Sequence, residues 1–292
     1  MRLAGKVNVR EAVRHLSGEL TSAGIVDSRL EASLIVSHVL KVDRGNLLLA
    51  TDRVLMESEL EAVFKCLRRR VLHEPLQYVF GEWPFLDLQL EVSPSALIPR
   101  PETEEWVDRL LETLIPKYLG ANSIRWFADI GAGTGAIGLA LANGLPLSCG
   151  LLCDISPEAV TLAQRNLARH PAAASRLSLI LGDLTLSLHD SAFDLVASNP
   201  PYIKSADMPG LMPEVRDHEP RMALDGGKFG TSIIARLLAD LGRVLRPGGL
   251  AAFEHGDGQR PSILALPAPG LSLLEAGNDA CGRERFLVWV KR

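Results

Sequence analysis

Four consecutive residues combine hydrogen-bond acceptors with a flat aromatic face. They are Asn199, Pro200, Pro201 and Tyr202, and they directly follow the apolar run Phe193–Ser198, which predicts a buried strand. The carboxyl ends of strands in an open α/β sheet face the crevice where ligands bind. Prolines cannot extend a strand ladder and hold the backbone extended. The side-chain oxygen of Asn199 and a prolyl carbonyl can therefore accept hydrogen bonds from one NH₂ group, with the Tyr202 ring against its plane.

This arrangement suits one kind of chemistry. An amide or heteroaromatic NH₂ group is a poor nucleophile because its nitrogen lone pair is delocalised into the π system. Two acceptors on its hydrogens stabilise the positive charge that develops on the nitrogen as it attacks. If the electrophile is a sulfonium methyl group, no metal, covalent residue or strong base is needed. The tetrapeptide is typical of methyl transfer to a planar amino group, and the alternative is a loop that the prolines merely stiffen.

A glycine-rich segment at the first strand–helix junction predicts a cofactor site. It runs from Asp129 to Ala136 and contains Gly131, Ala132, Gly133, Thr134 and Gly135. Glycines let the backbone approach a ligand closely, and the helix N-terminus offers free N–H groups. Asp154, at the end of the next strand, can accept hydrogen bonds from both ribose hydroxyls of an adenosine.

This loop alone does not choose the cofactor. The same glycine spacing, followed about 20 residues later by an acid, satisfies the dinucleotide fingerprint. An NAD enzyme and an S-adenosylmethionine (SAM) enzyme both fit. Because a dehydrogenase has no use for the acceptors of Asn199–Tyr202, the tetrapeptide favours SAM.

Hydrophobic periodicity predicts the elements that position these groups. From about residue 124 onward, apolar runs alternate with helical patterns, which predicts a mainly parallel, doubly wound α/β sheet. Its seven strands are expected at Ile124–Ile130, Leu151–Ile155, Leu177–Leu181, Phe193–Ser198, Leu250–Glu254, Leu271–Glu275 and Phe286–Val290.

The chain before this sheet divides into two further regions. Residues 1–75 carry helical periodicity and predict a small bundle, whose third helix begins with the capping-box pair Ser58 and Glu61. Residues 76–100 predict a β-rich connector, in the form of a hairpin, and residues 101–292 form the α/β domain.

Charged side chains outside the motifs have plainer interpretations. The run Arg68–Arg70 is expected on a solvated face that the helix dipole favours. Arg100 and Glu102 are expected either to pair within the connector or to line the cofactor site. Glu254, together with its neighbour His255, is expected to be scaffolding at a strand end.

The composition excludes several classes of protein. A hydrophobic fraction of 47% and a formal charge of −4 argue against disorder and do not indicate stable nucleic-acid binding. The four cysteines lack metal-ligand spacing, so we expect no metal and four reduced, mostly buried thiols. The uncharged run Ile130–Cys153 contains glycines that favour a loop, a helix and a strand over a membrane span. With no targeting pattern, we expect a cytoplasmic monomer without membrane contact.

Further segments of the chain carry a family resemblance. They are Pro75–Gly81, Leu97–Glu104, Glu219–Gly227 and Glu254–Gly256. Together with Asn199–Tyr202, which adenine N6-methylases share, they resemble the HemK-type peptide-chain release factor glutamine methyltransferases. The similarity covers nearly the full chain and implies a class I SAM-dependent methyltransferase fold preceded by a helical domain.

The resemblance also implies site residues and a substrate. SAM would be held by Gly131–Gly135, Asp154, Asn199 and the region of Asp183 and Leu184. Asn199–Tyr202 would bind the glutamine of the Gly-Gly-Gln motif in release factors, giving N5-methylglutamine. Because a glutamine side chain is too small to identify a protein, the helical domain would recognise the partner.

Two alternatives stay open at this point. One is an N6-adenine methyltransferase acting on DNA or RNA, which needs a base-flipping pocket and a groove that follows the phosphates. The charge of −6 on residues 76–292 disfavours it. The other is a SAM-binding protein that no longer catalyses and acts through its helical domain.

Overall fold

The chain divides into two compact units. The computed structural model describes residues 6–120 and 123–292. One unit comprises the chain up to Gly81 together with Pro213–His218, and the other comprises Glu82–Met212 and Glu219–Arg292. Residues 1–5 of the predicted helical domain and 121–122 of the predicted α/β domain lie outside the described residues.

The first unit is helical. Its helices are α1 (Val9–Ser22), α2 (Ser28–Leu40), α3 (Arg44–Leu49), α4 (Glu57–Arg70), α5 (Leu76–Phe80) and α11 (Pro213–Arg216). Leu16, Leu20 and Ile35 are wholly buried in its core, as the helical periodicity requires. α1 begins with a capping box, in which the Asn8 side chain accepts from the Glu11 amide at 2.9 Å and the Glu11 carboxylate accepts from the Asn8 amide at 3.0 Å.

The predicted cap of the third long helix is wrong, because the N-cap is Met56, two residues before Ser58. α4 begins at Glu57, and the Glu59 carboxylate accepts from the backbone N–H of Met56 at 2.8 Å. The same carboxylate pairs with Arg53 at 2.7 Å. Because Glu59 already satisfies the first turn, Ser58 and Glu61 are not needed as a capping pair.

The arginine run at the end of α4 is only partly solvated: Arg68 is exposed, as predicted, but Arg70 is not. The Arg70 side chain is buried and pairs with Glu31 at 2.6 Å and with Glu214 of α11 at 2.9 Å. Arg69 pairs with Glu74 and donates to two backbone carbonyls. The burial of Arg70 was not predicted because its partner Glu214 lies far away in the sequence, and no local pattern indicates that the two residues pair.

The connector is part helix and part hairpin. Leu76–Phe80 is the helix α5, whereas β1 (Glu82–Phe85) and β2 (Leu88–Glu91) pair antiparallel across a two-residue turn. Leu86 in this turn has φ of 50°, the left-handed conformation that tight hairpin turns require. The hairpin belongs to the same unit as the large sheet.

The second unit contains the predicted seven-stranded sheet. Its strands are β3 (Trp126–Ile130), β4 (Cys149–Asp154), β5 (Leu177–Leu181), β6 (Phe193–Ser198), β7 (Leu245–Glu254), β8 (Leu271–Asn278) and β9 (Glu284–Lys291). The spatial order is β5-β4-β3-β6-β7-β9-β8, with β9 antiparallel to both of its neighbours and the other pairs parallel. The mainly parallel α/β prediction is confirmed. β7 begins five residues earlier than expected, because its pairing with β6 is irregular between Phe193 and Leu195.

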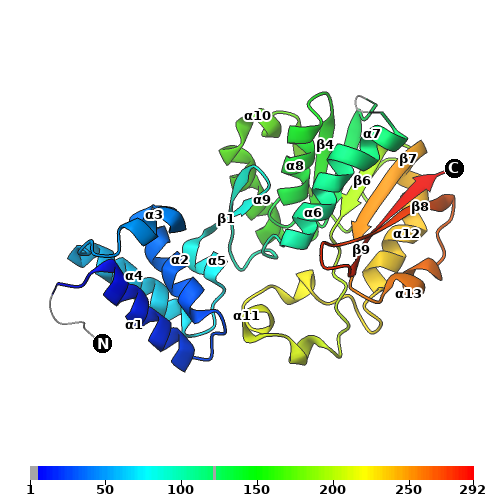
Figure 1. Ribbon diagram of the computed structural model, residues 1–292. Helices are drawn as coiled ribbons and strands as arrows, with labels where there is room; N and C mark the ends of the chain where they lie inside the picture. Colours follow the sequence, from blue (N-terminus) through cyan, green and yellow to red (C-terminus); the bar gives the residue numbers. More distant parts are fainter. Residues whose placement is uncertain (1–5, 121–122) are drawn as a thin grey trace. The chain divides into compact units, whose positions relative to one another are not determined.

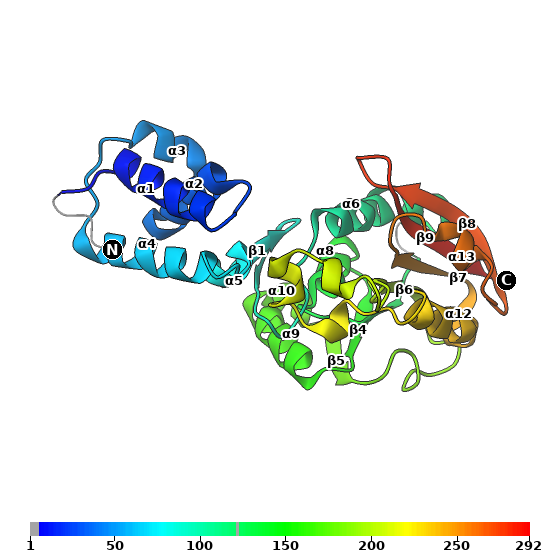
Figure 2. The ribbon, with the colours of Figure 1, turned by 90° about the horizontal axis from the view of Figure 1, so that it is seen from below.

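Helices cover both faces of this sheet (Figure 1). They are α6 (Pro101–Arg109), continued by the π-helical turn Leu110–Leu114 and α7 (Ile115–Tyr118), then α8 (Ala136–Gly144), α9 (Pro157–Arg169), α10 (Pro171–Ala174), α12 (Ser232–Val244) and α13 (Arg260–Leu264). Short 3₁₀ turns cover Met208–Gly210 and Arg221–Ala223. Figure 2 shows α9 beside β4 and β5, and α12 beside β7.

Successive strand residues alternate between two cores. Leu195 and Ala197 of β6 pack with α6 and α8 on one face, whereas Phe193 and Val196 pack with α12 on the other. This alternation explains why the strands read as continuous apolar runs, since both faces are covered. The uncharged run Ile130–Cys153 is accordingly a loop, the helix α8 and the strand β4.

Two further sequence expectations have structural outcomes. Among the described residues, no helix is both long and apolar enough to cross a membrane. All four cysteines are free thiols, but only Cys153 is buried, and Cys281 is exposed on the turn between β8 and β9. The expectation of mostly buried thiols is therefore wrong.

Candidate active site

Three adjacent parallel strands end at the same level of the sheet. Ile130 at the end of β3 is paired with Cys153 of β4 on one side and Ser198 of β6 on the other. The residues that follow these positions are Gly131, Asp154 and Asn199. The predicted cofactor loop, the predicted ribose ligand and the predicted reactive tetrapeptide therefore begin side by side.

A cavity of about 610 Å³ opens at this edge. This volume is typical of sites for small ligands and cofactors, which span roughly 300–1,000 Å³. The loop Gly131–Thr134, the segment Asp154–Ser156 after β4 and the segment Gly182–Leu184 after β5 line it. Pro94–Pro99 after the hairpin and Pro220–Ala223 before α12 complete the walls.

Two glycines of the loop have backbone conformations that residues with a side chain rarely adopt. Gly131 has φ of 73° and Gly133 has φ of 56°, both in the left-handed region that glycine adopts without strain. Buried Asn166 of α9 fixes the loop, because its side-chain amide donates to the carbonyl of Thr134 at 2.9 Å and to that of Glu91 in β2 at 3.0 Å. One side chain thus ties the hairpin, the loop and α9 together.

Two aspartates flank the loop in different environments. Asp154 accepts from the backbone N–H of Gly133 at 2.8 Å and from that of Ser156 at 2.9 Å, which fixes its carboxylate at the cavity wall. Each oxygen keeps a lone pair for a further donor such as a ribose hydroxyl. Asp129 is wholly buried and accepts from the Gly138 N–H at 2.8 Å. Burial raises the pKa of Asp129 to about 7, and the charge of Asp154 adds to the rise.

Hydrogen bonds to three other residues hold the predicted reactive tetrapeptide. The Asn199 side-chain amide donates to the Thr103 hydroxyl at 3.1 Å, and the Tyr202 hydroxyl donates to the Glu254 carboxylate at 3.0 Å. The carbonyl of Tyr202 accepts from Gln259 at 2.7 Å. Burial raises the pKa of Tyr202, and so does the negative charge of Glu254, so that the phenol remains protonated.

Two ion pairs shape the cavity, and the sequence indicated neither. Asp183 pairs with Arg236 of α12 at 2.6 Å, and both residues line the cavity. Arg100 pairs with Glu219 rather than with Glu102, and neither Arg100 nor Glu102 lines the cavity, so both expectations for these residues are wrong. Buried Glu219 also accepts from the Ile98 backbone N–H at 3.3 Å. It therefore joins two cavity segments that are more than 100 residues apart in sequence.

The cavity brings most of the predicted site residues together. Those that line it are Gly131, Ala132, Gly133, Thr134, Asp154, Asp183, Leu184, Asn199 and Pro201. Gly135, Pro200 and Tyr202 are not lining residues: Gly135 is the N-cap of α8, and Tyr202 turns toward Glu254. Other residues line the cavity without having been predicted, among them Ser156, Met222 and Arg236, which carry no motif of their own beyond Met222's place in Glu219–Gly227.

Comparisons with known proteins agree with this geometry. Residues 11–81 match the PrmC N-terminal domain, and residues 107–215 match the methyltransferase small domain. The release factor glutamine methyltransferase of Nitratidesulfovibrio vulgaris is 37% identical over 94% of this chain and 92% of its own length. That of Geobacter sulfurreducens is 39% identical over 88% and 87%, and the human MTRF1L release factor glutamine methyltransferase is 34% identical over 98% and 88%.

The chain belongs to the release factor glutamine methyltransferase family. A solved structure of the hMettl16 catalytic domain with the MAT2A 3′UTR hairpin 6 is 15% identical, covers 82% of this chain and 84% of its own, and has a TM-score of 0.51. At that identity it supports the class I methyltransferase fold alone. The protein is thus a SAM-dependent methyltransferase, and SAM is its methyl donor.

The residues of the cavity fit this cofactor. SAM is an adenosine that carries an amino acid chain, and a cavity of about 610 Å³ has room for it. The glycine loop lets the backbone approach the ligand closely, and the fixed carboxylate of Asp154 can accept from the ribose. We expect Gly131–Thr134 and Asp154 to hold SAM, with Asp183 and Leu184 forming the wall after β5.

Replacing Asp154 tests the cofactor assignment. Asp154→Ala removes a carboxylate that the structure fixes at the cavity wall. We expect the Kd for SAM to rise about 10- to 150-fold, because a charge-assisted hydrogen bond contributes about 1.5–3 kcal/mol. Calorimetric titration with SAM measures this. Asp190→Ala is the matched control, since Asp190 pairs with Arg243 and does not line the cavity. Unchanged affinity in folded Asp154→Ala would move the ribose contact elsewhere.

Proposed function

We propose that the protein transfers the methyl group of SAM to the side-chain amide nitrogen of the glutamine in the Gly-Gly-Gln motif of release factors. The product is N5-methylglutamine. One observation carries the proposal: Asn199 lines the same cavity as the glycine loop and Asp154, with its amide nitrogen already engaged by Thr103. The names of the relatives support release factors as the substrate class.

The residues of the chain supply orientation and charge stabilisation. The Asn199 oxygen and a prolyl carbonyl of the tetrapeptide accept the two hydrogens of the glutamine NH₂ group. This aligns the nitrogen lone pair with the sulfonium methyl that bound SAM supplies. The nitrogen–carbon bond forms as the carbon–sulfur bond breaks, and the sulfur keeps the electron pair as a neutral thioether. Because positive charge grows on the nitrogen, both acceptors bind the transition state more strongly than the ground state. The extra proton on the nitrogen then passes to water.

An adenine N6-methyltransferase is the alternative with the same chemistry. The acceptor pair would also fit the exocyclic NH₂ of a flipped adenine. Such an enzyme needs basic side chains along the phosphates, whereas residues 76–292 carry a formal charge of −6. The similarity to release factor glutamine methyltransferases along most of the chain also argues against it. We therefore expect no stable binding of nucleic acid.

We also propose that the helical unit recognises the release factor. The glutamine pocket alone cannot select one protein, because many proteins display glutamine. Among its described residues, the helical unit has none that lines the cavity described above. On α3 it exposes two adjacent apolar side chains, Leu48 and Leu49, at 75% and 87% of their area. Exposed apolar side chains of this kind are typical of surfaces that bind a protein partner. Since release factors act on ribosomes, we place the enzyme in the cytoplasm, and we expect it to act as a monomer.

Asn199→Ala tests the chemical role. We expect kcat on release factor to fall about 100-fold or more while the Kd for SAM stays nearly unchanged, because the variant deletes an acceptor on the reacting NH₂ group. Tandem mass spectrometry of the Gly-Gly-Gln peptide, after incubation of intact release factor with enzyme and SAM, measures the product. Equal turnover combined with weaker SAM binding would make Asn199 a cofactor ligand only. Methylation of RNA or DNA but not of release factor would favour the adenine alternative.

The double variant Leu48→Glu, Leu49→Glu tests the recognition role. We expect KM for intact release factor to rise about tenfold, as for loss of an apolar contact in an interface. The Kd for SAM and turnover of a short Gly-Gly-Gln peptide should not change. Leu186→Glu, in the other unit and 69% exposed, is the matched control. Unchanged KM for release factor in the double variant would exclude this part of α3 from the binding surface.

A further inference from the structure

One buried carboxylate in the second unit has no role in the chemistry described above. Glu254 ends β7, is wholly buried, and accepts three side-chain hydrogen bonds. Its Oε2 accepts from the Thr103 hydroxyl at 2.6 Å and from the Trp106 indole at 2.9 Å, and its Oε1 accepts from the Tyr202 hydroxyl at 3.0 Å. Burying a carboxylate costs free energy unless donors surround it. Here two of the three donors come from α6 and the third from the reactive tetrapeptide.

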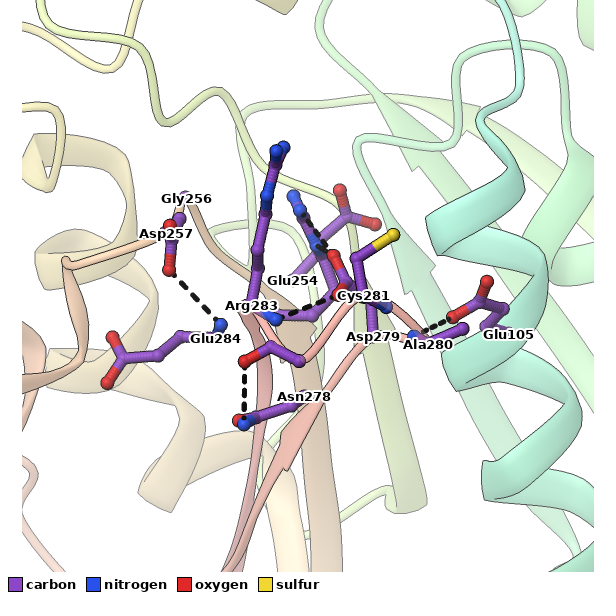
Figure 3. A network of polar contacts seen from close by, with 12 residues as sticks. Glu105, Glu254, Gly256, Asp257, Asn278, Asp279, Ala280, Cys281, Arg283 and Glu284 are labelled. Carbon is purple, nitrogen blue, oxygen red and sulfur yellow. Dashed lines mark hydrogen bonds and ion pairs between the residues drawn. The ribbon is translucent and has the colours of Figure 1, made fainter.

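A cation offsets part of the charge. The Arg285 side chain is nearly buried and acts electrostatically on both Glu254 and Tyr202. Asp279, on the turn between β8 and β9, holds Arg285 at 2.8 Å. Figure 3 shows Glu254 together with Asp279 and the turn Ala280–Arg283. Burial raises the pKa of Glu254, while the three donors and Arg285 oppose the rise.

The polarity of this chain of hydrogen bonds follows from counting protons. An indole N–H can only donate, so the contact with Trp106 identifies Oε2 of Glu254 as an acceptor. The Thr103 hydroxyl has one hydrogen, which it donates to the same oxygen. Its oxygen is then left only to accept. The atom of Asn199 that faces it at 3.1 Å is therefore the NH₂ nitrogen and not the carbonyl oxygen.

This polarity decides which end of the Asn199 amide is available. The two ends of a primary amide are nearly equal in size, so packing alone cannot choose between them. A flipped Asn199 would present NH₂ to the NH₂ of the substrate and would oppose the positive charge that develops there. Only a neighbour of defined hydrogen-bond polarity can exclude the flipped state. Thr103 is such a neighbour because Glu254 fixes the direction of its hydroxyl.

We propose that Thr103 and Glu254 are positioning residues that hold the Asn199 side-chain amide with its oxygen toward the substrate nitrogen. The proposal rests on the proposed function. Neither residue is assigned contact with the reacting atoms: Glu254 acts through Thr103, and Thr103 acts through Asn199. The same carboxylate fixes the Tyr202 hydroxyl, so one buried charge orients both ends of the tetrapeptide.

Variants of Thr103 separate hydrogen-bond polarity from packing. Thr103→Val keeps the shape and removes the hydroxyl, and Thr103→Ser keeps the hydroxyl. We expect Thr103→Val to lower kcat on release factor about fivefold to fifteenfold, the change that corresponds to one net hydrogen bond, with the Kd for SAM unchanged. Thr103→Ser should recover kcat to within about threefold. Glu254→Gln, which replaces one acceptor oxygen by a donor, should lower kcat at least as much and serves as a second variant if Thr103→Val folds poorly.

A matched control and a second readout make the test specific. Thr185→Val also removes a buried threonine–carboxylate hydrogen bond, from Thr185 to Asp240 at 2.7 Å, and should leave kcat unchanged. NMR detects the side-chain NH₂ signals of Asn199, assigned by their loss in Asn199→Ala. These hydrogens should exchange with solvent faster in Thr103→Val than in Thr103→Ser.

The outcomes distinguish this proposal from the proposed function. If the parent enzyme does not methylate release factor, the proposed function fails, and the NMR comparison still tests the orientation of Asn199. If the parent is active and Thr103→Val keeps its kcat, the positioning role is wrong. A loss of kcat that Thr103→Ser does not recover would assign the effect to packing and would also overturn the proposal.

Discussion

The active site depends on the parallel pairing of β3 with both β4 and β6. Ile130 lies level with Cys153 and Ser198, so the three residues that follow leave the sheet side by side. A shift of one residue in either pairing would turn the strand's side chains to the opposite face. The alternating packing of β6 against α6 and α8 on one face and α12 on the other makes such a shift costly. Packing of the core thus places the cofactor loop beside the tetrapeptide.

Carboxylates then fix the residues that the strands bring close together, and of these Asp154 is half-buried while Glu219 and Glu254 are buried. Asp154 holds two backbone amides, Glu219 joins the segments on two sides of the cavity, and Glu254 supports Asn199 and Tyr202 through hydroxyl groups. Each of these side chains has donors that offset the cost of burial. Groups fixed before the substrate arrives need not reorganise as charge develops, which is the main source of electrostatic catalysis. We therefore regard the site as preorganised by charges that lie outside its motifs.

The sequence predicted the parts of the protein that local patterns determine. The seven strands follow from apolar runs, and the loop at Gly131–Gly135 and the acid at Asp154 follow from spacing at strand ends. What it missed depends on pairs far apart in sequence. Arg70 pairs with Glu214, Arg100 pairs with Glu219, and Thr103 donates a hydrogen bond to Glu254, each across more than 100 residues of sequence. A side chain's burial and partner at such separations are set by the folded arrangement of elements, which periodicity does not specify. The cap of α4 was predicted wrongly for the opposite reason. Glu59 and Glu61 both lie near the start of the helix, and the local pattern does not show which of them accepts from the backbone.

The central claim is that Asn199 presents its oxygen to the substrate amide beside the bound methyl donor. The most direct measurement is a crystal structure of the full chain with S-adenosylhomocysteine and a Gly-Gly-Gln peptide. The account predicts the glutamine nitrogen at about 2.8–3.2 Å from both the Asn199 side-chain oxygen and a prolyl carbonyl of the tetrapeptide. It also predicts that the Asn199 nitrogen stays on Thr103. A glutamine amide bound away from Asn199, or an Asn199 oxygen that faces Thr103 instead, would contradict the account.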